Sequence, residues 1–84
     1  MSQDKTSLFN VKDIDNQLVR NILSEVWDAL EERGYNPSNQ IVGYLISGDP
    51  GYISSYKDAR NIIQQIDRAK ILEVLLQEFY KYNK

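Results

Sequence analysis

The chain has 84 residues, a net charge of −2 and a pI near 5.0, and it contains neither cysteine nor histidine. This length fits one domain, and the missing residue types exclude disulfides, thiolate catalysis and a zinc site built from Cys and His. The acidic balance weighs against nucleic acid as the main partner, because phosphate binding needs concentrated Lys and Arg. No stretch approaches the ~20 apolar residues of a membrane span. The first ten residues lack the apolar core of a signal peptide, so we expect a cytoplasmic protein.

A first helix is predicted over residues 13–33. Asp13 or Asp15 can cap its N-terminus, and Gly34 suits the left-handed residue that follows a helix end. At about 100° per residue, one half of the helical wheel is apolar and the other half is polar. The apolar half holds Leu18, Val19, Ile22, Leu23, Val26, Trp27, Ala29 and Leu30.

Turn-forming residues then concentrate in one stretch, GYNPSNQIVGYLISGDPGY. Asn36 is the expected N-cap of a second helix, with Pro37 at its first position, where a missing N–H costs nothing. Gly48 ends this helix, and Pro50 follows at the usual distance. The sequence GDPGY predicts a tight turn.

Gly43 falls in the middle of the second helix, where glycine costs about 1 kcal/mol relative to alanine. Close approach by another backbone would offset that cost, and so would a Tyr side chain lying across the glycine. The apolar side of this helix is supplied by Ile41, Val42 and Leu45.

Two further helices are predicted, over about 56–66 and 68–82. Ser55 followed by Asp58 resembles a capping box for the helix over 56–66. Asp67 can cap the helix over 68–82, or it merely separates the two helices. The apolar faces hold Ala59, Ile62, Ile63 and Ile66 in one helix, and Ile71, Leu72, Leu75, Leu76, Phe79 and Tyr82 in the other.

No alternation of period two has a useful length, so the sequence predicts an all-α fold. We expect a compact bundle of four or five short helices over residues 13–84, preceded by a flexible, polar N-terminal arm of residues 1–12. Two predicted helices have apolar arcs of about 180°, wider than the roughly 100° stripe that one contact needs. The surplus predicts a homodimer; the alternative is a monomer that covers every apolar face.

We expect no enzyme activity, no cofactor and no metal. A nucleophile would lack its usual histidine base, and the carboxylates fall mostly on polar helix faces. GYLISGDPG lacks the spacing and the Lys of a phosphate-binding P-loop. The helix–turn–helix rhythm leaves a small helical dimer that binds nucleic acid as the alternative function. Its candidate recognition helix carries Lys57, Arg60, Arg68 and Lys70, with Asp58 and Asp67 among them.

In the segment DKTSLF, Thr6 and Ser7 are candidate phosphorylation sites. A phosphate adds a charge of about −1.5 to −2 and three strong acceptor oxygens, so it could pair with Arg or Lys elsewhere. From these residues alone an idle arm is the favoured alternative, because any exposed Thr looks the same.

The stretch GYNPSNQIVGYLISGDPGYI followed by KDARNII resembles the signature of the IreB/ReoM family, small cytoplasmic regulators of low-GC Gram-positive bacteria. The likeness is nearly continuous over residues 34–63 and looser over the whole chain. DALEERGYNP is similar to the end of the family's first helix. DKTSLF is similar to the family's N-terminal segment, with its threonine at Thr6.

The resemblance implies a small all-helical homodimer with a disordered N-terminal arm. It implies phosphorylation at Thr6 by the membrane serine/threonine kinase that carries extracellular PASTA repeats, reversed by a cognate phosphatase. Unphosphorylated family members promote Clp-protease degradation of the enolpyruvyl transferase that begins peptidoglycan synthesis, and phosphorylation relieves this. The implied output is control of cell-wall synthesis and cephalosporin tolerance.

The chain departs from the family in three places. Family members commonly read Ile-Pro-Arg-His where residues 53–56 read ISSY, so part of a basic surface is missing. They often read Arg-Asp-Glu where residues 68–70 read RAK, which removes an expected helix cap. Ser7 replaces a residue that is often Met. Both Thr6 and Ser7 therefore stay open as the modified residue, with Thr6 favoured.

Roles follow for the remaining residues. We expect Lys57, Arg60 and Arg68 to meet a partner or the phosphate, with solvated helix charges as the alternative. The Leu and Ile positions of the first and last helices should form the core and the dimer seam, with Leu75→Ala costing about 2–5 kcal/mol if Leu75 is fully buried. The turn-forming residues should be structural: Gly34, Tyr35, Asn36, Pro37, Asn39, Gly43, Gly48, Asp49 and Pro50.

Overall fold

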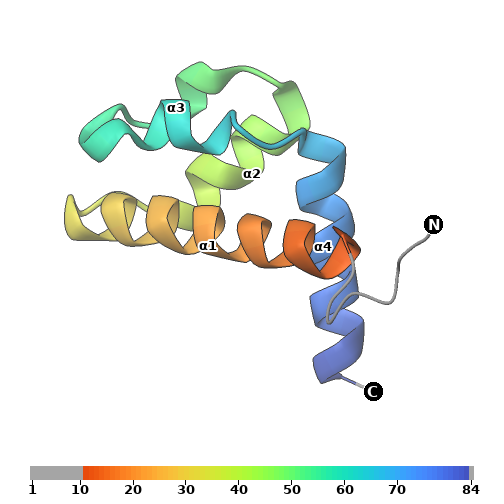
Figure 1. Cartoon of the computed structure of the whole chain (residues 1–84). Coiled ribbons are helices and arrows are strands. Elements are labelled where there is room, and N and C mark those ends of the chain that lie inside the picture. The colour runs from red at the N-terminus through yellow and green to blue at the C-terminus, as the bar shows by residue number, and fades with distance from the viewer. Residues whose placement is uncertain (1–10, 84) are drawn as a thin grey trace.

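A computed structural model of the chain describes residues 11–83, with side chains from residue 15 onward, and every regular element in this part is helical (Figure 1). The predicted all-α fold is confirmed for these residues. No helix among them is long and apolar enough to cross a membrane. The elements are α1 (Val11–Glu32), α2 (Pro37–Ser47), the 3₁₀ turns η1 (Pro50–Tyr52) and η2 (Tyr56–Asp58), α3 (Ala59–Ile63) and α4 (Arg68–Tyr82).

The helices are arranged around α1, which contacts α2, α3 and α4. α3 runs alongside α1 and packs directly against it, and α2 packs against α1 and η1 (Figure 1). α4 stands across the N-terminal end of α1, and its C-terminal half extends past α1, away from α2 and α3 (Figure 1). The first half of α4 is therefore placed to join the core, and the second half is not.

The core is one cluster of apolar side chains drawn from all four helices and from Ile53 in the loop before η2. Burying one such Val, Leu or Ile side chain stabilises a fold by about 1.5–3 kcal/mol. The buried residues are Val19, Ile22, Val26, Ala29, Leu30, Ile41, Tyr44, Leu45, Ile53, Ala59, Ile63, Ile71 and Val74.

The ends of α1 confirm one prediction and correct another. Gly34 adopts φ +85°, and the N–H groups of Gly34 and Tyr35 donate to the carbonyls of Glu31 and Leu30, which is the Schellman pattern expected after a helix. The prediction that Asp13 or Asp15 caps the N-terminus is wrong. The helix already begins at Val11, because neither Val11 nor the next residue breaks a helix.

The ends of α2 are as predicted. The Asn36 side chain accepts a hydrogen bond of 3.1 Å from the Asn39 N–H, and Pro37 is the first helical residue. Gly48 is left-handed at φ +77°, and its N–H donates to the Tyr44 carbonyl at 2.7 Å. Beyond it, Asp49 caps η1 by accepting a hydrogen bond of 2.8 Å from the N–H of Gly51.

The third helix is shorter than predicted, since α3 covers only Ala59–Ile63. The predicted capping box is also wrong: the Ser55 side chain makes no capping hydrogen bond, and Asp58 does not lie in a helical conformation. Lys57 and Asp58 adopt left-handed backbone angles, with φ of +49° and +64°. Two consecutive left-handed residues interrupt a right-handed helix, so the α-helix starts only after them.

The last helix has the predicted bounds, but it turns only part of its predicted apolar face to the core. Of that face only Ile71 is buried, together with Val74, which the prediction did not place there; both lie in the half of α4 that packs against the other helices. The remaining large apolar residues of its middle turns stay exposed in the single chain, at 45% for Leu72, 41% for Leu75, 70% for Leu76 and 68% for Phe79. We call these four residues the α4 stripe.

Candidate functional site

The predicted modification sites, Thr6 and Ser7, lie outside the described residues. The three cations predicted to meet a partner or the phosphate all lie inside, and each makes a contact within the chain. That they meet a partner stays a prediction. In the structure, each of them forms a hydrogen bond within its own chain.

Lys57 belongs to a small polar cluster that joins η2 to the end of α1. Its Nζ lies 2.8 Å from Oε1 of Glu32, and the Tyr56 hydroxyl donates to Oε2 of the same carboxylate at 3.0 Å. The guanidinium of Arg33 lies over the Tyr56 ring, 5.2 Å from its centre. The Lys57 and Tyr56 hydrogen bonds lower the pKa of Glu32, and the Glu32 carboxylate raises the pKa of Lys57. The cluster holds the left-handed segment against α1.

Arg60 and Arg68 donate to backbone carbonyls and not to acidic side chains. Nε of Arg60 donates to the carbonyl of Ile53 at 2.8 Å, which fixes the loop that carries this buried residue. Nη1 of Arg68 donates to the carbonyl of Leu45 at 2.9 Å, and its guanidinium lies against Gly48. Arg68 therefore satisfies a carbonyl that the end of α2 would otherwise leave open.

Most of the turn residues predicted to be structural lie at helix ends: Gly34 follows α1, Asn36, Pro37 and Gly48 bound α2, and Asp49 caps η1. Gly43 lies inside α2, against the ring of Tyr52. Tyr35 has no capping side chain. Only its backbone N–H takes part in the turn, and its side chain is 42% exposed.

Sequence reasoning missed an apolar groove of about 250 Å³ between α1, α2 and α4, which we call the α1–α2–α4 groove. Among the described residues, Ser38 is the one polar side chain that lines it. Trp27, the only tryptophan of the chain, is 41% exposed here, and Val42 is 49% exposed. The signal that could have found the groove was the width of the apolar arc on the first helix. Its apolar lining is Leu23, Trp27, Ile41, Val42, Leu45 and Leu75.

The α4 stripe adjoins this groove through Leu75, which belongs to both. Its members follow the spacing i, i+3, i+4 and i+7, so they share one face of the helix. Contiguous exposed apolar surface of this kind marks protein-interaction sites more often than it occurs by chance on a monomer.

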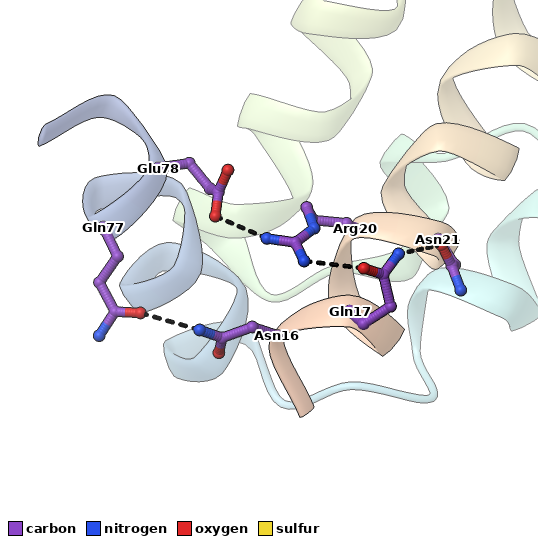
Figure 2. Close-up of polar contacts among 6 residues, drawn as sticks. All are labelled: Asn16, Gln17, Arg20, Asn21, Gln77 and Glu78. Atoms are coloured by element: carbon purple, nitrogen blue, oxygen red, sulfur yellow. Dashed lines mark hydrogen bonds and ion pairs between the residues drawn. The ribbon is translucent and has the colours of Figure 1, made fainter. Parts of the chain in front are cut away.

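A polar junction fixes the angle at which α4 crosses α1, as Figure 2 shows. Nη1 of Arg20 lies 2.8 Å from Oε2 of Glu78, and the other terminal nitrogen of Arg20 donates to Oε1 of Gln17 at 2.8 Å. Nδ2 of Asn16 donates to Oε1 of Gln77 at 3.3 Å. These contacts hold the second half of α4 to α1 where the apolar core does not reach.

The site thus consists of two apolar surfaces, the α4 stripe and the α1–α2–α4 groove, and of the ion pairs Arg20–Glu78 and Glu32–Lys57. Within the described residues, no group of three or more acidic side chains is arranged to hold a metal ion. The fold and its surfaces define a small all-α protein with exposed apolar area suited to binding other proteins.

The chain matches the family model described as IreB regulatory phosphoprotein over residues 4–81, and it belongs to this family. The match confirms the resemblance seen in the turn-rich stretch. It gives the chain a regulatory role, and it spans both the described helices and the segment that contains Thr6.

Proposed function

We propose that this chain is a non-enzymatic, phosphorylation-switched adaptor of the cytoplasm. Thr6 is the switch residue, modified by a serine/threonine kinase with extracellular PASTA repeats and restored by its phosphatase. In the unphosphorylated state the chain promotes Clp-dependent turnover of the enolpyruvyl transferase, and phosphorylation relieves this. The chain thereby sets the rate of peptidoglycan synthesis and the tolerance of cephalosporins.

The observation that carries this proposal is the family match, whose span includes Thr6. The chemistry of the chain agrees with it. An adaptor needs surface for other proteins, which the α4 stripe and the α1–α2–α4 groove supply. A phosphate at Thr6 adds a charge of about −1.5 to −2 to a chain whose net charge is already −2, so it changes the electrostatics of binding.

We also propose that the chain works as a homodimer, with the α4 stripe of each protomer covered by the other. A domain of this size buries only about 60% of the surface of its unfolded chain and gains from further burial. The four side chains of the stripe extend the apolar surface of α4 beyond what the core of one protomer covers.

The alternative of nucleic-acid binding gains no support from the site. Lys57, Arg60 and Arg68 each contact an acceptor of their own chain. Phosphate-driven binding would show affinity that falls steeply with salt. The absence of any DNA or RNA binding at low salt would remove this alternative.

The deciding experiment is intact-mass and fragment analysis of the protein after incubation with the PASTA kinase of its own cell. One phosphate located at Thr6 is expected, absent from Thr6→Ala and retained by the matched control Ser7→Ala. No modification, or a phosphate on the helices α1 to α4, would contradict the switch. In cells, Thr6→Ala should lower the level of the enolpyruvyl transferase, and removal of the Clp protease should restore it.

A further inference from the structure

A hollow of about 270 Å³ lies between the first half of α1, the start of α4 and the link that precedes α4. We call it the α1–α4 hollow; its lining includes Asp15, Leu18, Val19, Ile66, Asp67 and Lys70. We propose that the unmodified N-terminal arm of the same chain docks in this hollow through Leu8, and that a phosphate on Thr6 releases it. The inference rests on the proposed switch, because it says what the phosphate changes in this chain.

The hollow faces away from the surface that the proposed homodimer covers. Lys70 precedes Phe79 of the α4 stripe by nine residues, and Leu18 precedes Trp27 of the α1–α2–α4 groove by the same number. Nine residues make two and a half helical turns, so the two members of each pair point to opposite sides of their helix. A second copy that covers the α4 stripe therefore leaves the α1–α4 hollow open.

Apolar surface in the hollow is left uncovered by the described part of the chain. Leu18 is 47% exposed, and Ile66 is half-buried. Between Ser2 and Asn10 the arm has only two apolar residues, Leu8 and the one that follows it. A docked Leu8 removes apolar surface of its own and of the hollow from water, which favours docking.

The length of the arm allows Leu8 to reach Leu18. Leu8 precedes Val11, the first residue of α1, by three residues, and three extended residues span about 10 Å. Seven residues of helix, from Val11 to Leu18, rise by about 10 Å as well. An arm that turns back along α1 thus brings Leu8 level with Leu18, and Thr6 lies roughly 7 Å further along the arm.

The charge of the lining is acidic. Asp15 and Asp67 are both exposed, and neither forms an ion pair with another described residue. The Asp67 side chain does not cap α4 either. Lys70 is already held by Glu73 at 3.3 Å, and Arg68 donates to a backbone carbonyl at the end of α2. The hollow therefore presents two carboxylates that no cation among the described residues neutralises.

These carboxylates distinguish Thr6 from its phosphorylated form. Side chains two residues apart share one face of an extended segment, so Thr6 faces the same surface as Leu8. The unmodified Thr6 hydroxyl can donate a hydrogen bond to Asp15 or Asp67. A phosphate carries a charge of about −1.5 to −2 into the same place, and like charges brought together oppose binding. We expect phosphorylation to weaken docking about three- to tenfold.

Nuclear Overhauser effects between methyl groups test the docking in the full chain. In the unmodified protein, a contact between the methyl groups of Leu8 and Leu18 is expected. When phosphothreonine is incorporated at position 6 during synthesis of the chain, this contact should weaken. The methyl shifts of Leu18 and Ile66 should then move towards those of a Leu8→Ser variant, in which the arm has lost its anchor.

Variants of the hollow locate the effect. Leu18→Glu should abolish docking, whereas Ile46→Glu, which is 79% exposed on α2 and lies outside the hollow, should leave it unchanged. In the phosphorylated chain, Asp15→Asn combined with Asp67→Asn should restore the contact. The matched control is Asp28→Asn, an exposed aspartate outside the hollow, which should not restore it. Circular dichroism of each variant checks that the helices are retained.

Three outcomes would overturn the inference. The first is that the unmodified protein shows no contact between Leu8 and Leu18. The second is a contact that persists or strengthens with the phosphate on Thr6. The third is a contact seen only between differently labelled chains in a mixed sample, which would assign the arm to the hollow of a second copy.

The experiment also separates this inference from the proposed switch. Phosphothreonine placed by synthesis needs no kinase. A chain that releases its arm but is not modified by the kinase would contradict the switch alone. A chain that the kinase modifies at Thr6 but that never docks its arm would contradict this inference alone.

Discussion

The ring of Tyr52 lies directly on Gly43. A Cβ atom added to this glycine would come within 2.5 Å of Cδ1 of Tyr52, and within 3.0 Å of two further ring atoms. Glycine inside a helix costs about 1 kcal/mol relative to alanine. The sequence left two possibilities open for Gly43, close approach by another backbone or a Tyr side chain lying across it, and the structure shows the second. This contact places η1 across the middle of α2.

Gly43→Ala should therefore destabilise the protein, although alanine is the better helix former. Overpacking against an aromatic ring costs about 1–3 kcal/mol, which outweighs the gain in helix propensity. Urea denaturation measures the change. In a Tyr52→Ala background the ring is gone, and Gly43→Ala should become neutral or stabilising. Equal effects of Gly43→Ala in both backgrounds would show that the contact does not matter.

Arg68 was predicted to meet a partner, and the structure gives it a second role at the end of α2. Its hydrogen bond to the Leu45 carbonyl is charge-assisted, a type that contributes about 1.5–3 kcal/mol when well formed. Because Arg68 is partly exposed, Arg68→Ala should lower the free energy of unfolding by about 1–2 kcal/mol. Arg68→Lys should recover only part of this, since Lys is a point charge without the planar fork.

The matched control is Lys70→Ala, two residues further on, where the side chain makes only a 3.3 Å contact with Glu73. This variant should change the stability little. If Arg68→Ala left the stability unchanged and weakened only the binding of a partner, Arg68 would be a docking residue and not a helix cap.

The Glu32–Lys57 pair predicts a small dependence of stability on pH at both ends of the range. The folded pKa of Glu32 lies below its ordinary value near 4.5, chiefly through the Lys57 hydrogen bond. Its contribution is therefore present above about pH 4.5 and is lost as the pH falls through the lowered pKa. The pKa of Lys57 lies above its ordinary value of 10.5, so its contribution is present below that pH and is lost as the pH rises through the raised pKa.

Glu32→Gln should remove both effects. The stability difference between the unmodified protein and Glu32→Gln, followed by urea denaturation across pH, should be largest between these limits and shrink outside them. It should also decrease with added salt, because the pair is exposed. Glu31→Gln, which removes a neighbouring carboxylate without an ion pair among the described residues, should follow the curve of the unmodified protein. Parallel curves for Glu32→Gln would contradict the prediction.

The sequence predicted the elements whose signals are local. The cap at Asn36 and Pro37, the left-handed glycines and the bounds of α4 depend on residues close together in the chain, and the structure confirms them. The third helix depends on distant contacts. Lys57 is left-handed and pairs with Glu32, which lies 25 residues earlier, and no local propensity indicates that turn.

The exposed apolar surfaces were likewise predictable only in part. The excess of apolar residues on the first and last helices was visible in the sequence. The sequence did not show which of these residues would be buried in the core, because burial depends on how α4 crosses α1. Val74 is buried, whereas Leu75, its neighbour in the chain, is 41% exposed. The sequence also could not predict the hydrogen-bond partners of Arg60 and Arg68. Both side chains donate to backbone carbonyls, and a backbone carbonyl is present at every position of the sequence.

The exposed α4 stripe leads to the last prediction, which concerns the proposed homodimer. Phe79→Glu and Leu76→Glu change side chains that are 68% and 70% exposed, so the fold of a single chain should tolerate them. If a second copy covers the stripe, each variant should be monomeric in sedimentation at micromolar concentration, where the unmodified protein is a dimer. Leu18→Glu, at another exposed leucine outside the stripe, is the matched control and should stay dimeric.

Stability supplies an independent measure of the same interface. In a dimer the midpoint of unfolding rises with protein concentration, and Leu75→Ala should cost about 2–5 kcal/mol because Leu75 becomes fully buried. In a monomer its 41% exposure makes the cost smaller, and the midpoint does not depend on concentration. An unmodified protein that sediments as a monomer at micromolar concentration would refute the dimer. The α4 stripe would then remain open for another protein to cover.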